Sequence, residues 1–281
     1  MPCCTGTAAM DLAATPKIAE GWTAELYAMS PTVVLKLYRP GFEGVGHAEF
    51  GKTRHLRTQT PLVPEVFEET LVRGRAGYLM ERIDAPALGR LPERSDAAIA
   101  QTLFETQQRF RGLRGNELFA PVSERIAQRL GAARSSLGSA AERALAVLAM
   151  AGGSAPTLCH GDYHPGNLLL GAGGARVIDW NGAVIGPLEA DVAKSLLLML
   201  YAPPTLAWDG ALHGRRREIS RFYLELLRAE RRFDEAALGR WLFVRLVEFF
   251  TLPVPALHAP LRPLAERWAT TATFAAEEMW R

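Results

Sequence analysis

The sequence is poor in cysteine and has no long apolar run. Its three cysteines are Cys3, Cys4 and Cys159. An odd and small number of thiols predicts no disulfide framework, so we expect a cytoplasmic protein. The longest apolar runs, such as residues 144–151, are too short to cross a bilayer, and we expect no membrane partner. Residues 1–16 do not resemble a signal peptide. We interpret them as a flexible N-terminal tail, with the true start at either Met1 or Met10.

The sequence also lacks an excess of charge of either sign, and it is poor in lysine. Lys and Arg together number 32 and Asp and Glu 30, which leaves a net charge of +2. This balance argues against a nucleic-acid polymer as partner. The few lysines are Lys17, Lys36, Lys52 and Lys194. With 48% hydrophobic and 22% charged residues the composition is that of an ordinary globular protein. A lysine inside an apolar segment of this chain is therefore a candidate functional residue.

The first part of the chain has the pattern of strands with one helix. Residues 32–38 are β-branched and large apolar residues, which predicts a strand. A helix is predicted over 44–58 and a hairpin over 64–72 and 76–83, around a glycine-containing turn. The turn-rich segment 85–92 is the predicted boundary between an N-lobe at 17–84 and a C-lobe at 85–281.

The second part of the chain is mainly helical. Ser95 is the predicted cap of a helix that ends near Arg111. One or two helices follow over 121–150, interrupted near Gly138. Short strands are then predicted, over residues 157–159, 167–170 and 175–178. From Glu189 onward helices return, with breaks predicted at 203–204, near Phe233 and over 253–263. The pattern predicts an α+β fold with a small β-rich lobe followed by a larger helical lobe.

A polar loop between two of the short strands carries the candidate chemistry. It contains His160, Asp162, His164 and Asn167, and Asp179 follows the next strand. Carboxylate and amide oxygens suit a hard cation such as Mg²⁺, and a further carboxylate can orient a proton of an attacking hydroxyl. The alternatives are a zinc site on the two histidines, which Gly and Pro in the loop disfavour, and a purely structural polar turn.

This loop and the segment 178–180 resemble the catalytic and metal loops of the aminoglycoside phosphotransferase-like kinases, which include choline kinases. The resemblance implies a bilobal protein-kinase-like fold that uses ATP and Mg²⁺. It implies Asp162 as the catalytic base and Asn167 and Asp179 as the Mg²⁺ ligands. It assigns support of the catalytic loop to His160 and His164.

Further residues match the same pattern in the expected order. Lys36 occupies the position of the lysine that contacts the ATP phosphates; the alternative is an exposed strand lysine. Its acidic partner is predicted to be Glu49, with Glu43 as second choice. The remaining matches are a nucleotide-covering loop with Gly21 and Thr23, a hinge strand with Met80, Glu81 and Ile83 for adenine, and Asp191 as support of the catalytic loop.

The substrate half of the sequence leaves the acceptor open. Most tryptophans come at or after the metal loop, namely Trp180, Trp208, Trp241, Trp268 and Trp280. They favour helix-packing core over an aromatic cage for a quaternary ammonium. The region after 181 is not acidic overall, which disfavours a polycationic acceptor, although local acidic clusters at 234–235, at 248 and at 277–278 keep such a pocket open. The run 215–217 is interpreted as a solvated arginine-rich face, with an anionic substrate as the alternative.

We therefore predict an ATP- and Mg²⁺-dependent kinase that transfers the γ-phosphoryl group to a hydroxyl of a small molecule. The alternatives are a nucleotide-binding module without catalysis and a kinase that acts on a protein. The short passage between 179 and 189 favours a small acceptor over a protein. The sequence does not name the acceptor, does not decide between ATP and GTP, and leaves the oligomeric state open.

Overall fold

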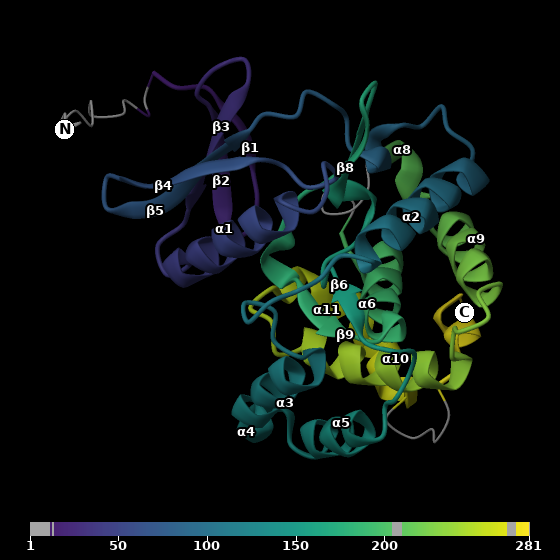
Figure 1. Ribbon diagram of the computed structural model, residues 1–281. Helices are drawn as coiled ribbons and strands as arrows, with labels where there is room; N and C mark the ends of the chain where they lie inside the picture. Colours follow the sequence, from purple (N-terminus) through teal and green to yellow (C-terminus); the bar gives the residue numbers. More distant parts are fainter. Residues whose placement is uncertain (1–11, 13, 204–209, 269–273, 281) are drawn as a thin grey trace. The chain divides into compact units, whose positions relative to one another are not determined.

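The computed structural model describes residues 12, 14–203, 210–268 and 274–280. The chain packs as two units, residues 1–84 and residues 85–281, and each is described here by itself (Figure 1). The predicted tail, including Cys3, Cys4 and most of residues 1–16, lies outside the described residues, as does Trp208. No helix in the described part of the chain is long and apolar enough to span a membrane.

The N-terminal unit is a five-stranded antiparallel sheet with one helix (Figure 1). The strand order is β1-β2-β3-β5-β4. Their bounds are Lys17–Glu20 for β1, Ala24–Ala28 for β2, Val33–Tyr38 for β3, Val66–Val72 for β4 and Arg75–Glu81 for β5. The helix α1, Glu43–Arg57, packs against β5 and β4. The predicted strand, helix and hairpin are all confirmed. Positive φ angles of 52° at Arg73 and 77° at Gly74 allow the tight hairpin turn.

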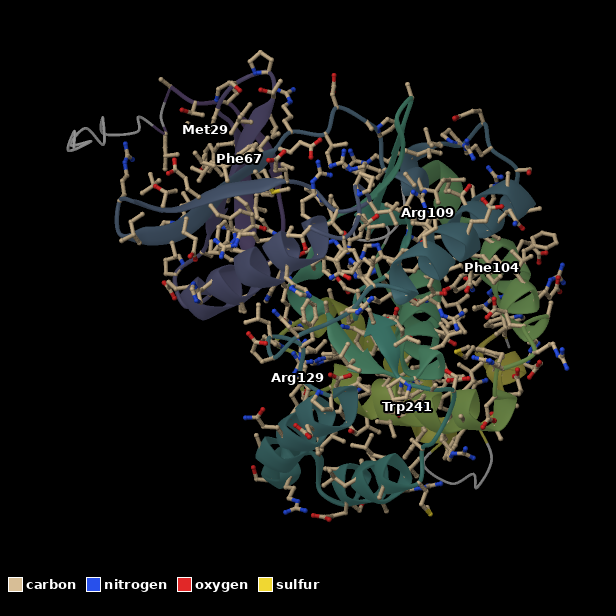
Figure 2. The ribbon with its side chains drawn as sticks, in the orientation of Figure 1. Met29, Phe67, Phe104, Arg109, Arg129 and Trp241 are labelled. Atoms are coloured by element: carbon tan, nitrogen blue, oxygen red, sulfur yellow. The ribbon has the colours of Figure 1, made fainter. Side chains whose placement is uncertain are left out.

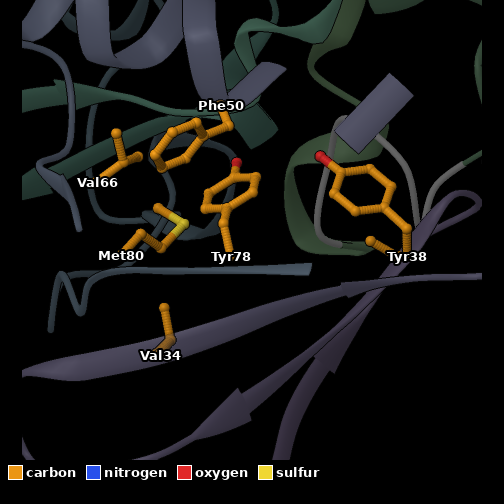
Figure 3. Packing of buried hydrophobic residues seen from close by; sticks show 7 residues of the cluster. Val34, Tyr38, Phe50, Val66, Tyr78 and Met80 are labelled. Atoms are coloured by element: carbon orange, nitrogen blue, oxygen red, sulfur yellow. The ribbon is translucent and has the colours of Figure 1, made fainter. Parts of the chain in front are cut away.

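Strand alternation decides which side chains of β3 face α1. Val34 and Tyr38 join Phe50, Tyr78 and Met80 in one buried cluster (Figure 3), whereas Leu35 and Leu37 belong to a second cluster. Because side chains alternate along a strand, Lys36 lies on the same side of β3 as Val34 and Tyr38. Lys36, the one charged residue of β3, therefore lies on the face of the sheet that α1 covers.

The C-terminal unit is mainly helical and carries two small two-stranded sheets. Its strands are β6 (Thr157–Cys159), β7 (Leu168–Gly171), β8 (Gly174–Val177) and β9 (Val184–Gly186), and β6 pairs with β9 while β7 pairs with β8. Its described α-helices are α2 (Asp96–Arg111), α3 (Val122–Ala132), α4 (Arg134–Leu137), α5 (Ser139–Ala149), α6 (Leu188–Tyr201), α8 (Gly210–His213), α9 (Arg216–Arg228), α10 (Glu235–Phe249) and α11 (Pro255–Trp268). Short 3₁₀ turns are η1 (Leu88–Arg90), η2 (Pro165–Asn167), η3 (Trp180–Gly182) and η4 (Ala276–Trp280).

Two helices form the centre of this unit. Nearly every residue of α6 and of the second half of α10 is buried, and the two helices pack against each other. The predicted start of α2 is confirmed, since the Ser95 side chain accepts a hydrogen bond from the Ala98 N–H at 3.2 Å. Gly138, with φ of 52°, separates α4 from α5. The predicted interruption is therefore confirmed, with three helical pieces instead of one or two.

The sequence analysis missed one strand and placed one helix break too far along the chain. The strand β9 was not predicted, because three residues that pair with β6 across a long loop leave no periodic pattern. The break expected over 253–263 is present only at its start: the chain is non-helical over 250–254, and α11 begins at Pro255 and runs through Pro260 and Pro263. Its apolar residues Leu257, Leu261 and Leu264 are buried. Their packing offsets the ~3 kcal/mol that an interior proline takes from a helix.

Candidate active site

In the N-terminal unit, a buried ion pair joins β3 to α1. The Lys36 Nζ lies 2.8 Å from both carboxylate oxygens of Glu49, and both side chains are almost fully buried. The Tyr38 hydroxyl donates a third hydrogen bond to the same carboxylate. Burial raises the pKa of Tyr38, so the hydroxyl stays protonated and remains a donor. Glu43 is exposed and accepts from the Gly41 N–H, so it is not the partner of Lys36.

A glycine in α1 makes room for this arrangement. A Cβ on Gly46 would lie 2.6 Å from a ring carbon of Tyr38, closer than side chains pack. The absence of a side chain at Gly46 therefore lets the Tyr38 ring lie against the helix while its hydroxyl reaches Glu49.

The predicted nucleotide loop and hinge strand lie in the same unit. Gly21 is in the β1–β2 turn, where its N–H donates to the Ala24 carbonyl at 2.8 Å, so this N–H is already used within the turn. Thr23, half-buried, is in the same turn. Met80 is part of the buried cluster in Figure 3. Glu81 ends β5, and Ile83 follows two residues later.

In the C-terminal unit, the loop after β6 is held by one buried carboxylate of α6. Asp191 accepts the N–H groups of His160 at 3.2 Å and Gly161 at 2.7 Å. The Gln107 amide of α2 donates to the same carboxylate at 3.4 Å. Gly161 has φ of +74°, and a Cβ there would lie 2.2 Å from the Gly182 carbonyl oxygen. The loop conformation therefore requires glycine at this position.

Asp162 is presented by this loop with its side chain 30% exposed. The Asn167 amide donates to the Asp162 carbonyl at 2.9 Å and to its Oδ2 at 3.3 Å. On the other side, the Lys194 ammonium donates to the Gly161 carbonyl and lies 4.0 Å from Asp162 Oδ1. The two oxygens of Asp162 thus face different neighbours, an amide and a buried ammonium.

The two histidines of the loop are neutral structural groups. His164 Nδ1 accepts from the Gly166 N–H at 3.1 Å, and His160 Nε2 lies 3.0 Å from the Ile178 carbonyl, to which it donates. Burial lowers the pKa of both rings. Among the described residues, no three or more His, Cys, Asp or Glu side chains are grouped so that they could hold a metal ion. This geometry does not support the zinc alternative.

A backbone hydrogen bond holds the residue before Asp179 beside Asn167. The Ile178 N–H donates to the Asn167 carbonyl at 3.0 Å, and Asp179 itself has φ of 68°. Because the Asn167 amide nitrogen is used by Asp162, its amide oxygen is the group left to act as a ligand. An amide oxygen and a carboxylate are ligands that fit Mg²⁺.

A group of arginines close to Asp162 was missed by the sequence reasoning. Arg129 of α3, labelled in Figure 2, and Arg245 of α10 both pair with Glu248, at 2.6 and 2.7 Å. Burial alone would raise the pKa of Glu248, but Arg245, Lys194 and Arg129 overcome it and hold the pKa at about 2. Lys194 had a usable signal, since it is one of few lysines and begins an apolar run. The arginines had none, because arginine is common in this chain.

Several expectations about the substrate half can be compared with the structure. Trp180, Trp241 and Trp268 are buried core residues, and each indole N–H has an acceptor within the protein. Arg215 does not belong to a solvated face, because it bonds Asp96 at 2.7 Å and so links α9 to α2. Glu235 and Glu277 both pair with one arginine.

The comparisons with known proteins agree with this architecture. The model of the family described as "Phosphotransferase enzyme family" matches residues 15–237. The chain therefore belongs to this family, and its fold is the kinase-like fold of aminoglycoside phosphotransferases. No curated protein sequence matches it.

Three solved structures illustrate the likeness. An aminoglycoside-3'-phosphotransferase of type VIII has TM-score 0.62 and 20% identity, over 84% of this chain and 93% of that one. A thermostable mutant of APH(4)-Ia, in complex with AMP-PNP and hygromycin B, has TM-score 0.61 and 16% identity, over 92% and 95%. A choline/ethanolamine kinase family protein from Mesorhizobium loti has TM-score 0.55 and 14% identity, over 90% and 84%. At these identities the likeness establishes the fold.

Proposed function

We propose that this protein is an ATP- and Mg²⁺-dependent kinase that transfers the γ-phosphoryl group to a hydroxyl of a small molecule. The observation that carries the proposal is the loop geometry of the C-terminal unit. A partly exposed carboxylate, Asp162, is held beside Asn167, which is in turn bonded to the residue before Asp179. A solved structure with AMP-PNP and an antibiotic in the same fold supports nucleotide and small-molecule binding.

Each of these residues has a distinct part in the proposed reaction. Lys36 binds nucleotide phosphates, and Glu49 and Tyr38 hold its ammonium in place. Asp162 accepts a hydrogen bond from the acceptor hydroxyl and directs its oxygen at the γ-phosphorus. As the new O–P bond forms, the bond from the γ-phosphorus to the bridging oxygen of ATP breaks and ADP leaves, and Asp162 takes up the hydroxyl proton. This alignment makes the reaction effectively intramolecular.

The metal would be held by two oxygen ligands, Asn167 and Asp179. Mg²⁺ supplies charge neutralisation of the phosphate oxygens when it is bound. Asp191 keeps the loop fixed through two backbone N–H groups, so Asp162 needs little reorganisation before transfer. For adenine, Met80 would contribute an apolar contact, and the backbone of Glu81 and Ile83 would contribute hydrogen bonds. Gly21 and Thr23 would lie near the phosphates.

The test is an acceptor screen with a matched pair of variants. Purified protein is incubated with Mg-ATP and aminoglycosides, choline-like amines, amino alcohols, sugars and hydroxy acids, and ADP release is measured. Asp162→Asn keeps the size of the side chain and one oxygen that can accept from Asn167, but it removes the charge and the second acceptor oxygen, and turnover should fall at least about a hundredfold. The exposed Glu225→Gln serves as control and should leave turnover unchanged.

The binding of Mg-ATP, measured by thermal shift, separates the proposal from its alternatives. Asp162→Asn should keep the shift of the unmodified protein, whereas Lys36→Met should lose most of it. A shift without turnover on any acceptor would support a nucleotide-binding module instead. Full turnover in Asp162→Asn would refute the role of Asp162.

A further inference from the structure

Four cationic side chains converge near Asp162 from three helices of the C-terminal unit. Arg125 and Arg129 come from α3, Lys194 from α6 and Arg245 from α10. The electrostatic interactions of Lys194 link it to Asp162, Glu248, Arg245 and Arg129. Arg125 interacts electrostatically with the same four groups. The cluster is thus one connected group of charges; we call Arg125, Arg129, Lys194 and Arg245 the cationic cluster.

Among the described residues, the cationic cluster forms ion pairs with two carboxylates, Glu248 and Asp162. Glu248 is shared by Arg129 and Arg245, and Asp162 is the other carboxylate in this set. Arg125 instead donates to the Gly182 carbonyl at 2.8 Å, as Lys194 does to the Gly161 carbonyl. Backbone carbonyls satisfy hydrogen bonds but carry no net charge, so neither contact is an ion pair.

Burial of several cations close together affects Arg125 and Arg245. Burial, together with repulsion from Arg129, lowers the pKa of Arg125 to about 10. Arg245 is 3% exposed, and its Nη2 has no hydrogen-bond partner among the described residues. A buried guanidinium nitrogen without a partner is a costly arrangement that an additional anion can relieve.

Two members of the cationic cluster, Arg129 and Lys194, are partly exposed to solvent. The side chain of Arg129 is 31% exposed and that of Lys194 13%, beside Asp162 at 30%. Asp162 Oδ2 faces Asn167, and Oδ1 faces Lys194. An acceptor hydroxyl bound to Asp162 Oδ1 would therefore lie beside the Lys194 ammonium, on the side away from Asn167.

We propose that the cationic cluster binds an oxyanion of the acceptor, a carboxylate or a phosphate close to the hydroxyl that is phosphorylated. This inference rests on the proposed function, since it names the acceptor class of the same site. Polycationic acceptors are disfavoured by the same charges. They are further disfavoured because Glu235 and Glu277 are already paired with Arg228.

The first test measures binding without turnover. Sodium sulfate is titrated calorimetrically into protein saturated with Mg–AMP-PNP, at constant ionic strength balanced with NaCl. We expect saturable binding that weakens at least about tenfold in Arg129→Gln and is restored in Arg129→Lys. The control, Arg134→Gln, removes an exposed arginine of the next helix that pairs with Glu142, and should bind as the unmodified protein does.

The nucleotide state separates the two sources of an oxyanion. If the cationic cluster takes the anion of the acceptor, sulfate binds equally well beside AMP-PNP and beside ADP. Binding that appears only with ADP would assign the cluster to the γ-phosphate and overturn the acceptor assignment. No saturable binding, or equal binding in Arg129→Gln, would overturn the oxyanion site itself.

The second test uses acceptors in matched pairs. Hydroxy acids are compared with their amides, and sugar phosphates with the free sugars, in the ADP-release assay. In each pair that the enzyme phosphorylates, we expect the anionic acceptor to have the higher kcat/KM. In Arg129→Gln the ratio of the two kcat/KM values should fall about tenfold, because the KM of the anionic acceptor rises. The inference would be refuted if the best acceptor were neutral or cationic and its kcat/KM were the same in Arg129→Gln as in the unmodified protein.

The two proposals fail in different ways. Sulfate binding without ATP consumption on any acceptor would refute the kinase activity and leave the oxyanion site intact. Phosphorylation of neutral or cationic alcohols without sulfate binding would refute the oxyanion site and leave the kinase intact.

Discussion

Glu248 allows a quantitative test of the electrostatics around the catalytic loop. Its carboxylate is 3% exposed and is bonded by Arg129 and Arg245. A pKa that falls from 4.5 in the unfolded chain to about 2 in the folded protein corresponds to ~3 kcal/mol of stability at neutral pH. Replacement by Gln in Glu248→Gln keeps the volume but leaves the cations without their shared partner. We expect the free energy of unfolding to decrease by ~3 kcal/mol at pH 7.

The pH dependence gives the same reasoning a second check. Because the folded pKa lies below the unfolded value of 4.5, the stabilisation is complete above pH 4.5 and is lost as the pH falls toward 2. The slope cannot exceed ~1.4 kcal/mol per pH unit for one group. The stability difference between the unmodified protein and Glu248→Gln should therefore be constant from pH 7 to 5 and shrink below 4.5.

The measurement is urea unfolding followed by tryptophan fluorescence between pH 7 and 3.5. The control is Glu218→Gln, which removes an exposed partner of Arg221 and should change stability by less than about 0.5 kcal/mol. A difference below about 1 kcal/mol for Glu248→Gln at pH 7, or one that stays constant down to pH 3.5, would refute the argument.

Three further substitutions have defined expectations. Gly161→Ala places a Cβ 2.2 Å from the Gly182 carbonyl at a φ of +74°; it should destabilise the protein by more than ~2 kcal/mol in urea unfolding and abolish turnover. Tyr38→Phe removes a hydrogen bond to the Glu49 carboxylate; it should raise the KM for ATP several-fold in a steady-state assay and destabilise by ~2 kcal/mol, and an unchanged KM would contradict the role given to Tyr38. Ser95→Ala removes the cap of α2; a loss of ~1 kcal/mol in thermal unfolding is expected, with unchanged kcat.

Features encoded by neighbouring residues were predictable. The start of α2 depends on a cap three residues from its acceptor, and the β4–β5 turn on Arg73 and Gly74. The polar loop is likewise local, since Asn167 reaches Asp162 five positions away. Such contacts are governed by short-range geometry, and a single stretch of sequence displays them.

Features formed by distant residues were not predictable in the same way. Lys194 meets the carbonyl of Gly161 across 33 positions, and Arg129 meets Glu248 across 119. Neither pair shares a periodic pattern or a motif. Helix α11 makes the same point, because local proline preferences predicted a break and burial of its apolar stripe against the unit overrode them.

The sequence alone predicted an α+β fold from the periodicity of its strands and helices, and it predicted a phosphotransferase-type protein because the polar loop over 160–167 is a contiguous motif. The scarcity of cysteine and the balanced charge only excluded broad classes of protein. Only the tertiary structure decided how the charges are distributed. It placed four cations around Glu248 and Asp162, because the packing of α3, α6 and α10 brings together residues that are far apart in the sequence.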